Sequence, residues 1–375
     1  MKIETLAIHA GRRVDPATGA VALPIHLTST FERDEDGGYP RGFSYSRENN
    51  PVRKALEQCL AALEGGKDAI SFPSGLAVAS AVLQGLEPGD HIVAADDVYW
   101  ALRKVIGDVF GHAGLETTYV DTTNLDAVRA AMRPNTRLLW VETPSNPLMR
   151  VTDLRAMAAI AREPGRKVIT VCDGTFATPV LQRPLDCGID MVAHSTTKYI
   201  SGHSDVVGGT LIARFNNYLF ERARKSQRYG GAAPSPFDCW LSLRGIETLP
   251  YRVRAHSENA MALAEYLSGH PKVEKVNYPG LASHEGHAIA SRQMCGGFGG
   301  MLSFQVQGGR EEAMAVAARC ELFIRATSLG GTHSLIEHRA SIEGPASKTP
   351  HNLLRVSVGL EHIDDLVRDL AQALG

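Results

Sequence analysis

Short apolar runs alternate with helical patterns through the middle of the chain. Helical patterns such as LRAMAAIAR (154–162) lie between several of the runs. Repetition of strand, helix and strand predicts an α/β fold with a mainly parallel sheet that helices cover on both faces. The seven runs are rich in β-branched residues and bounded by turn residues: DAISF (68–72), HIVAA (91–95), TTYVD (117–121), RLLWVE (137–142), VITVCD (168–173), DMVAH (190–194) and VGGTLIA (207–213).

The pattern changes on both sides of this region. Residues 1–50 are rich in Gly, Pro, Thr and Arg with little periodicity, which predicts an extended arm that contacts a neighbouring subunit. A helix should begin at Asn50-Pro51, because proline suits the first helical turn, and Gly65-Gly66 should end it. From about residue 245 a long helical pattern leads into three strand-like runs and a final helix near 363–373. We therefore expect an arm (1–50), a large domain (51–245) and a smaller α+β domain (246–375).

Composition narrows the range of partners. The chain has 375 residues, of which 44% are hydrophobic and 21% charged, and its formal net charge is −2. The absence of a basic excess argues against nucleic acid and anionic membranes as partners. The first residues lack an apolar signal core, so a cytoplasmic location is expected. The six cysteines form no CxxC pair, which predicts reduced thiols and no metal site.

Unusual polar residues follow four of the predicted strands. The first strand precedes PSGL (73–76), the fourth ends in ETPSNP (142–147), the fifth ends in Asp173, and the sixth runs into HSTTKYISGHSD (194–205). Taken singly, each is also typical of an ordinary turn or helix cap. Because ligands of open α/β sheets bind beyond the carboxyl ends of the strands, we expect these residues to lie together.

The chemistry of this set matches one cofactor. A small-residue turn that opens a helix offers backbone N–H groups to a phosphate. Lys198 can react with an aldehyde, and Asp173 can pair with a protonated aromatic nitrogen. Pyridoxal phosphate carries all three groups, so the set predicts a pyridoxal-phosphate site.

Several segments then identify a family. YSRENNP, ETPSNP, TFATP, HSTTKYISGHSDVVGG, RGIETLPYR and LLRVSVGLEHIDDL occur in the family's order. The chain resembles the pyridoxal-phosphate enzymes of cysteine and methionine metabolism, nearly from end to end. The resemblance implies the aminotransferase-like architecture called fold type I and a homotetramer built as a dimer of dimers.

The resemblance also implies roles for individual residues. Lys198 would hold the cofactor covalently and later move the substrate Cα proton, and Asp173 would pair with the ring nitrogen. Tyr99 would stack on the ring and assist proton transfer, and Asn146 would contact the ring hydroxyl. Arg355 would bind the substrate α-carboxylate. The remaining implied residues are Gly75, Leu76, Ser195 and Thr197 for the phosphate, Tyr45 and Arg47 reaching it from a neighbouring subunit, and Ser328 and Leu329 near the substrate.

Three departures from the family pattern bear on specificity. Trp100 follows Tyr99 where relatives carry glycine, and Gly174 stands where Asn is common. His333 stands where many relatives that act at Cγ have Glu, near the distal part of the substrate. We expect His333 to change charge and hydrogen bonding there.

The leading functional hypothesis is a carbon–sulfur lyase of transsulfuration that resembles cystathionine γ-lyase. Alternatives are a cystathionine γ-synthase-like transferase acting on an acyl homoserine, and a cystathionine β-lyase. A non-catalytic ligand-binding protein on the same fold is more remote, because every residue needed for the chemistry is present. A nucleotide-dependent dehydrogenase is disfavoured, since no GxGxxG follows the first strand.

Overall fold

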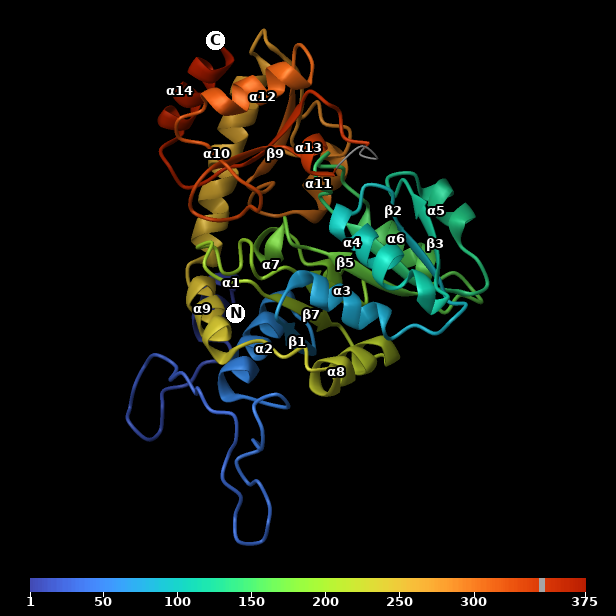
Figure 1. The fold of residues 1–375 in the computed structure, drawn as a ribbon, viewed down its shortest axis with the longest axis vertical. Helices are drawn as coiled ribbons and strands as arrows, with labels where there is room; N and C mark the ends of the chain where they lie inside the picture. The colour runs from blue at the N-terminus through green and yellow to red at the C-terminus, as the bar shows by residue number, and fades with distance from the viewer. Residues whose placement is uncertain (344–347) are drawn as a thin grey trace.

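The computed structural model describes residues 1–343 and 348–375, and its larger sheet has seven strands (Figure 1). The order across the sheet is β1-β7-β6-β5-β4-β2-β3. The pairs β2–β3, β2–β4, β4–β5 and β5–β6 are parallel, whereas β7 runs antiparallel to β1 and β6. The predicted mainly parallel sheet is therefore confirmed. The strands are β1 (Asp68–Phe72), β2 (His91–Ala95), β3 (Glu116–Val120), β4 (Thr136–Glu142), β5 (Ile169–Asp173), β6 (Met191–His194) and β7 (Gly209–Ala213).

Helices cover both faces of this sheet because its strands point buried apolar side chains to both sides. Val171 of β5 packs with the helices of one face, and its neighbour Cys172 packs with a helix of the other. Helices α3 (Gly75–Leu83), α4 (Trp100–Lys104) and α8 (Tyr218–Gly230) lie on the first face. The helices that pack in the clusters of the opposite face are α2 (Pro51–Glu64), α6 (Leu154–Ala161), α7 (Thr178–Leu181) and α9 (Pro236–Ile246). A further helix, α5 (Leu125–Ala131), lies beside β3 and α6.

Helix α2 begins and ends as the sequence predicts. The Asn50 side chain accepts a hydrogen bond from the Val52 amide, and Pro51 occupies the first turn. Gly65 caps the end with a φ of 70°, a left-handed conformation that glycine adopts without strain.

The C-terminal part has a five-stranded sheet in the order β10-β11-β12-β9-β8. Helix α10 (Leu249–Ser268) runs from the vicinity of α9 up to this sheet (Figure 1). The strands are β8 (Val273–Asn277), β9 (Met301–Val306), β10 (Ile324–Arg325), β11 (Leu335–His338) and β12 (Leu353–Ser357). The remaining helices are α11 (His287–Gln293), α12 (Arg310–Arg319), α13 (Arg339–Glu343) and α14 (Ile363–Leu374).

The N-terminal segment differs from a fully extended arm in one respect. Residues Ile3–His9 form helix α1, which contacts α2 and α10 and buries Ala7 completely. After α1 the chain leaves the body as two long loops (Figure 1). No helix in residues 1–343 or 348–375 is long and apolar enough to cross a membrane.

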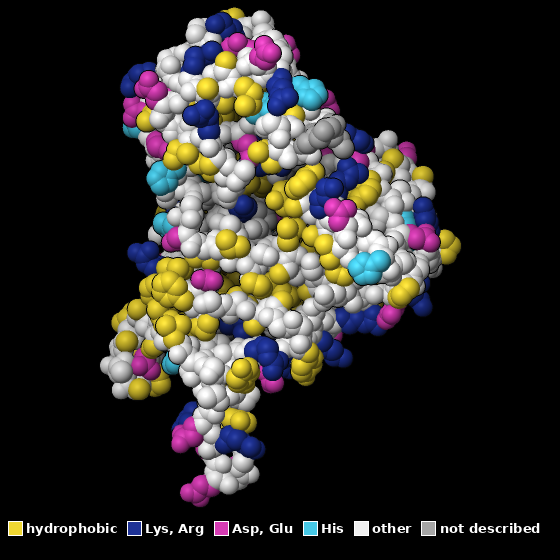
Figure 2. Space-filling view, in the orientation of Figure 1, with side chains coloured by type: hydrophobic (Ala, Val, Ile, Leu, Met, Phe, Trp, Pro, Cys, Tyr) yellow, Lys and Arg dark blue, Asp and Glu magenta, His cyan; other side chains and the backbone are white. Residues whose placement is uncertain are grey.

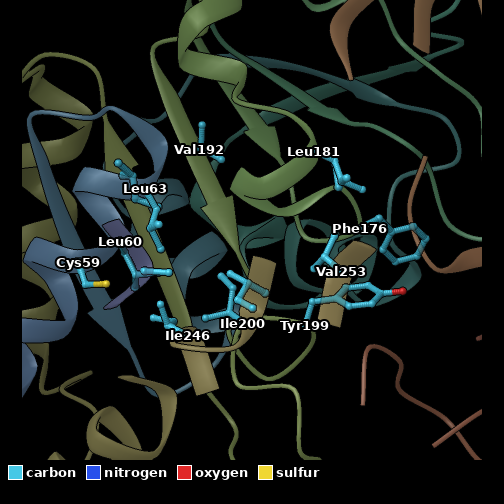
Figure 3. Packing of buried hydrophobic residues seen from close by; sticks show 14 of the residues in the cluster. Cys59, Leu60, Leu63, Phe176, Leu181, Val192, Tyr199, Ile200, Ile246 and Val253 are labelled. Atoms are coloured by element: carbon cyan, nitrogen blue, oxygen red, sulfur yellow. The ribbon is translucent and has the colours of Figure 1, made fainter. Parts of the chain in front are cut away.

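A buried cluster fixes the backbone next to the predicted lysine. Tyr199, directly after Lys198, is 1% exposed and packs near Phe176 and Val253 (Figure 3). Its ring meets the His256 ring edge-on, with centroids 5.2 Å apart. Because Tyr199 cannot move without breaking this packing, it holds Lys198 in place.

Candidate active site

A cavity of about 390 Å³ lies at the carboxyl ends of the parallel strands. Its walls come from the seven-stranded sheet, from α3 and α4, and from the C-terminal part, between which the surface is hollowed (Figure 2). Eleven of the predicted site residues line it: Gly75, Leu76, Tyr99, Asn146, Asp173, Ser195, Thr197, Lys198, Ser328, Leu329 and Arg355.

Lys198 follows β6 and is largely enclosed. Its Nζ donates a hydrogen bond to Ser328 Oγ at 2.8 Å. Burial, with a smaller contribution from the Arg355 guanidinium, lowers the pKa of Lys198 to about 8. A much larger fraction of this amine is therefore neutral near pH 8 than for an exposed lysine, and the neutral amine is the nucleophile.

Ser328 connects Lys198 to Arg355. Its carbonyl oxygen accepts a hydrogen bond from Arg355 Nη2 at 3.0 Å, while its hydroxyl accepts the one from Lys198. Ser328 has a φ of 78°, which is unusual for a residue with a side chain and indicates a constrained turn. Arg355 Nη1 donates to Asn146 Oδ1 at 3.1 Å. A guanidinium is thereby held close to the reactive amine.

Asp173 ends β5 and faces the same cavity. One carboxylate oxygen accepts a hydrogen bond from the Thr175 amide at 2.9 Å. Thr175 Oγ1 in turn accepts from the Ser195 amide at 2.9 Å, which joins the ends of β5 and β6. Burial raises the pKa of Asp173, so a cationic partner in the cavity would be needed to stabilise its charge fully.

Glu142 is a second buried carboxyl group that our reading of the sequence did not assign to the site. It ends β4 and pairs with Asp173 across the two strands. Its oxygens accept hydrogen bonds from the Tyr99 amide (2.9 Å) and the Asn146 amide (3.1 Å). Burial and the neighbouring Asp173 raise the pKa of Glu142 well above its ordinary value. Its position at a strand end is the signal that could have identified it.

The first turn of α3 offers an anion cradle. Ser74 caps the helix by accepting a hydrogen bond from the Ala77 amide. A Cβ atom at Gly75 would lie 3.0 Å from the Ser195 Cβ, so glycine permits the close approach of these two segments. The amides of a first helical turn lack intrahelical partners and favour an anion. Thr197 Oγ1 is bound to the Gly208 backbone, donating to its oxygen at 3.1 Å.

Three predicted residues do not line the cavity. Tyr45 and Arg47 lie on the N-terminal segment, where the Arg47 guanidinium carbon is 5.4 Å from the Tyr45 ring centroid. Arg47 also donates to the Arg228 carbonyl. His333 is exposed, with Nδ1 3.4 Å from Thr332 Oγ1. Within the described part of this single chain, these three side chains remain outside the site.

The mouth of the cavity carries apolar side chains. Trp100 follows Tyr99 and lines the cavity while remaining 38% exposed. Ile342 of α13 also lines it and is partly exposed. Both side chains therefore line the cavity while part of each is exposed at the surface.

Glu337 and Arg339 form a buried charge cluster behind Arg355. Glu337 faces Arg355 across β11 and β12, and Arg339 lines the cavity. No motif marks these residues, because their position depends on the register of two strands. Sequence reasoning therefore missed both.

Comparison with known proteins agrees with this geometry. A family described as Cys/Met metabolism PLP-dependent enzyme matches residues 4–375. The chain belongs to this family. It is 50% identical to a cystathionine gamma-synthase of Mycobacterium tuberculosis over 99% of this chain and 96% of that protein. It is 44% identical to a cystathionine gamma-lyase of Dictyostelium discoideum over 100% of this chain and 97% of the relative. A crystal structure titled metB from Corynebacterium glutamicum superposes with a TM-score of 0.97, at 42% identity, covering 100% of this chain and 98% of that one.

The protein is therefore a pyridoxal-phosphate-dependent enzyme of cysteine and methionine metabolism, and its fold is fold type I. The residues present fit the cofactor. Lys198 offers an amine of lowered pKa, Asp173 a buried carboxylate, and the start of α3 a phosphate cradle. All three line one cavity.

Proposed function

We propose that this enzyme cleaves a carbon–sulfur bond in the side chain of a sulfur amino acid, as a cystathionine γ-lyase-like enzyme. The observation that carries the proposal is the single cavity in which Lys198, Asp173 and Arg355 meet. Lys198 would hold the cofactor, Asp173 would keep the ring nitrogen protonated, and the first turn of α3 with Ser195 and Thr197 would bind the phosphate.

Arg355 orients the substrate in this proposal. Its guanidinium binds the α-carboxylate, with Asn146 and the Ser328 carbonyl fixing its plane. The Ser328–Lys198 hydrogen bond then sets the lysine amine close to the substrate Cα. Because both groups share Ser328, carboxylate binding and proton transfer occur in a fixed geometry.

Proton movements follow from that arrangement. Bound pyridoxal phosphate supplies an electron sink that stabilises negative charge on the substrate Cα. Lys198 removes the Cα proton as a neutral amine and returns a proton later. For a leaving group on Cγ, a second proton must leave Cβ before the C–S bond breaks. Tyr99, whose backbone amide donates to Glu142, would stack on the cofactor ring and assist proton transfer.

Elimination is the leading hypothesis because it requires one amino-acid substrate, and Arg355 supplies one carboxylate site. The other arginine lining the cavity, Arg339, is already bound to two carboxylates. A cystathionine γ-synthase-like replacement is the second candidate, favoured by the 50% identity to the mycobacterial synthases. A β-lyase remains the third, since a β-lyase of Coxiella burnetii is 45% identical.

A product assay separates these candidates. Purified enzyme should release a 2-oxo acid, ammonia and a thiol from cystathionine, without any added nucleophile. If 2-oxo acid appears in quantity only from an acyl homoserine, and addition of cysteine diverts that substrate into cystathionine, the enzyme is a synthase. Identification of the thiol and keto acid distinguishes β from γ cleavage.

We further propose a cytoplasmic homotetramer, a dimer of dimers whose active sites are shared between subunits. The N-terminal segment forms two long loops after α1, and its Tyr45 is 45% exposed in its own chain, which supports a role in a neighbour. Mixing an Arg47→Ala variant with a Lys198→Ala variant should restore part of the activity in mixed dimers. Absence of recovery, despite demonstrated subunit exchange, would argue for self-contained sites.

We propose that His333 influences which reaction the enzyme performs and is not required for binding of the cofactor or the substrate. The residue is exposed and lies outside the cavity of its own chain, so its effect would act at the entrance or through a neighbouring subunit. A His333→Glu variant should still bind cofactor and substrate while the ratio of β to γ products shifts. An unchanged ratio in the folded variant would remove His333 from the site.

A further inference from the structure

One carboxylate oxygen behind the cavity is shared by two arginines. Glu337 Oε2 forms an ion pair with Arg355 Nη2 at 2.6 Å and accepts a hydrogen bond from Arg339 Nη1 at 3.0 Å. The three side chains are at most 6% exposed. Arg339 Nη2 donates to Glu343 Oε1 at 3.1 Å, and this second carboxylate fixes the Arg339 guanidinium from the other side.

The pairing between Glu337 and Arg355 is half of a two-point contact. Nε and Nη2 lie on one edge of a guanidinium and together match the two oxygens of a carboxylate. In the ion pair, Nη2 lies 2.6 Å from Glu337 Oε2. Among the described residues, Arg355 Nε and Glu337 Oε1 have no hydrogen-bond partner, although both atoms are buried. A rotation of Glu337 that brought Oε1 to Nε would complete the two-point contact.

Completion of that contact would oppose substrate binding. A carboxylate that holds both Nε and Nη2 would neutralise Arg355 and occupy one edge of its guanidinium. The substrate α-carboxylate would then compete with the Glu337 carboxylate for the Arg355 guanidinium. Arg339 holds the shared oxygen with a hydrogen bond and offsets the charge of Glu337, so it works against this competition.

We propose that Arg339 is a positioning residue that keeps Arg355 available to the substrate α-carboxylate by sharing Glu337. The inference rests on the proposed function, since it takes Arg355 as the carboxylate site. It assigns Arg339 no contact with the α-carboxylate itself. The cluster also acts electrostatically on the Lys198 ammonium, through the charges of Arg339, Glu337 and Arg355. It therefore lies close enough to influence the reactive amine.

The test uses two ligands that differ only in the carboxylate. L-Norvaline has an α-amino group, an α-carboxylate and no leaving group, and n-butylamine is the same molecule without the carboxylate. Both are titrated into the holoenzyme, and their dissociation constants are read from the absorbance change of the bound cofactor. The readout is therefore a binding constant rather than turnover.

An Arg339→Gln variant should bind norvaline about tenfold more weakly, equivalent to about 1.4 kcal/mol. Its affinity for butylamine should stay within about twofold of the wild type. The double variant Arg339→Gln/Glu337→Gln should recover most of the norvaline affinity, because the competing carboxylate is gone. Arg339→Lys, which keeps the charge, should behave nearly like the wild type.

Several results would overturn the inference. Equal losses for both ligands, unchanged norvaline affinity, or no recovery in the double variant would each do so. If Arg339→Gln weakens only a ligand with a second carboxylate, such as L-2-aminoadipate, then Arg339 contacts substrate directly and the inference is wrong.

Two further measurements keep the test decisive. If Arg339→Gln does not fold, Glu337→Gln alone should bind norvaline at least as tightly as the wild type, and weaker binding would contradict the inference. Wild-type holoenzyme that binds butylamine but not norvaline would overturn the carboxylate role of Arg355 and the inference together.

Discussion

Cofactor uptake by the cofactor-free enzyme should depend steeply on pH below pH 8 and level off above it. The attacking group is the neutral amine of Lys198, whose pKa burial and the nearby Arg355 guanidinium lower to about 8. With that pKa the neutral fraction is about 1% at pH 6, about 9% at pH 7 and about 50% at pH 8. An unperturbed lysine with a pKa of 10.5 would be only about 0.3% neutral at pH 8.

The direction of the pH dependence is set by the protonation state of Lys198 that the cavity favours. Burial disfavours the ammonium, so protons leave Lys198 at lower pH than they would leave an exposed lysine. Between pH 6 and 8 the uptake rate should therefore rise about fifty-fold, in proportion to the neutral fraction. Above pH 9 it should change by less than about twofold.

The assay mixes cofactor-free enzyme with pyridoxal phosphate and follows the absorbance of the bound chromophore. The cofactor itself titrates in this range, so each rate is divided by the rate with Nα-acetyl-lysine under the same conditions. Because the reference amine keeps a pKa near 10.4, the ratio should be nearly constant below pH 7 and fall about sevenfold from pH 9 to 10. A ratio that stays constant through pH 10 would refute the lowered pKa of Lys198.

Three further substitutions test the site and the core. Asp173→Asn should lower kcat on the order of a hundredfold, because the ring nitrogen loses its carboxylate, while the melting temperature remains near that of the wild type; wild-type kcat would contradict the assignment. Leu63→Ala, at a fully buried position, should cost about 2–5 kcal/mol in the free energy of unfolding measured in urea, and a cost below 1 kcal/mol would contradict the packing. His333→Glu should change stability by less than about 0.5 kcal/mol, since the side chain is exposed; a large loss would contradict that exposure.

The strands of the large sheet were predictable because each one is marked by an apolar run with turn residues beside it. Each of the seven apolar runs became a strand, with bounds shifted by two residues or fewer. The run read as 207–213 became β7 (Gly209–Ala213), because Gly208 stays outside the sheet and bonds with Thr197. Asn50-Pro51 starts α2 as predicted, since capping acts over only a few residues.

The residues of the candidate site that follow strand ends or belong to motifs were predictable from the sequence. Lys198, Asp173 and Asn146 follow strands whose carboxyl ends meet at one edge of the sheet. The Glu337–Arg339 cluster could not be found in this way. Glu337 faces Arg355 because β11 pairs antiparallel with β12, and that register depends on tertiary packing rather than on neighbouring residues.

Lys198 should bind the cofactor covalently. The direct measurement is borohydride reduction of the holoenzyme, followed by proteolysis and mass mapping of the pyridoxyl-bearing peptide. We expect one modified lysine, Lys198, in the segment HSTTKYISGH (194–203). A pyridoxyl group on another lysine, with Lys198 unmodified in active enzyme, would contradict it.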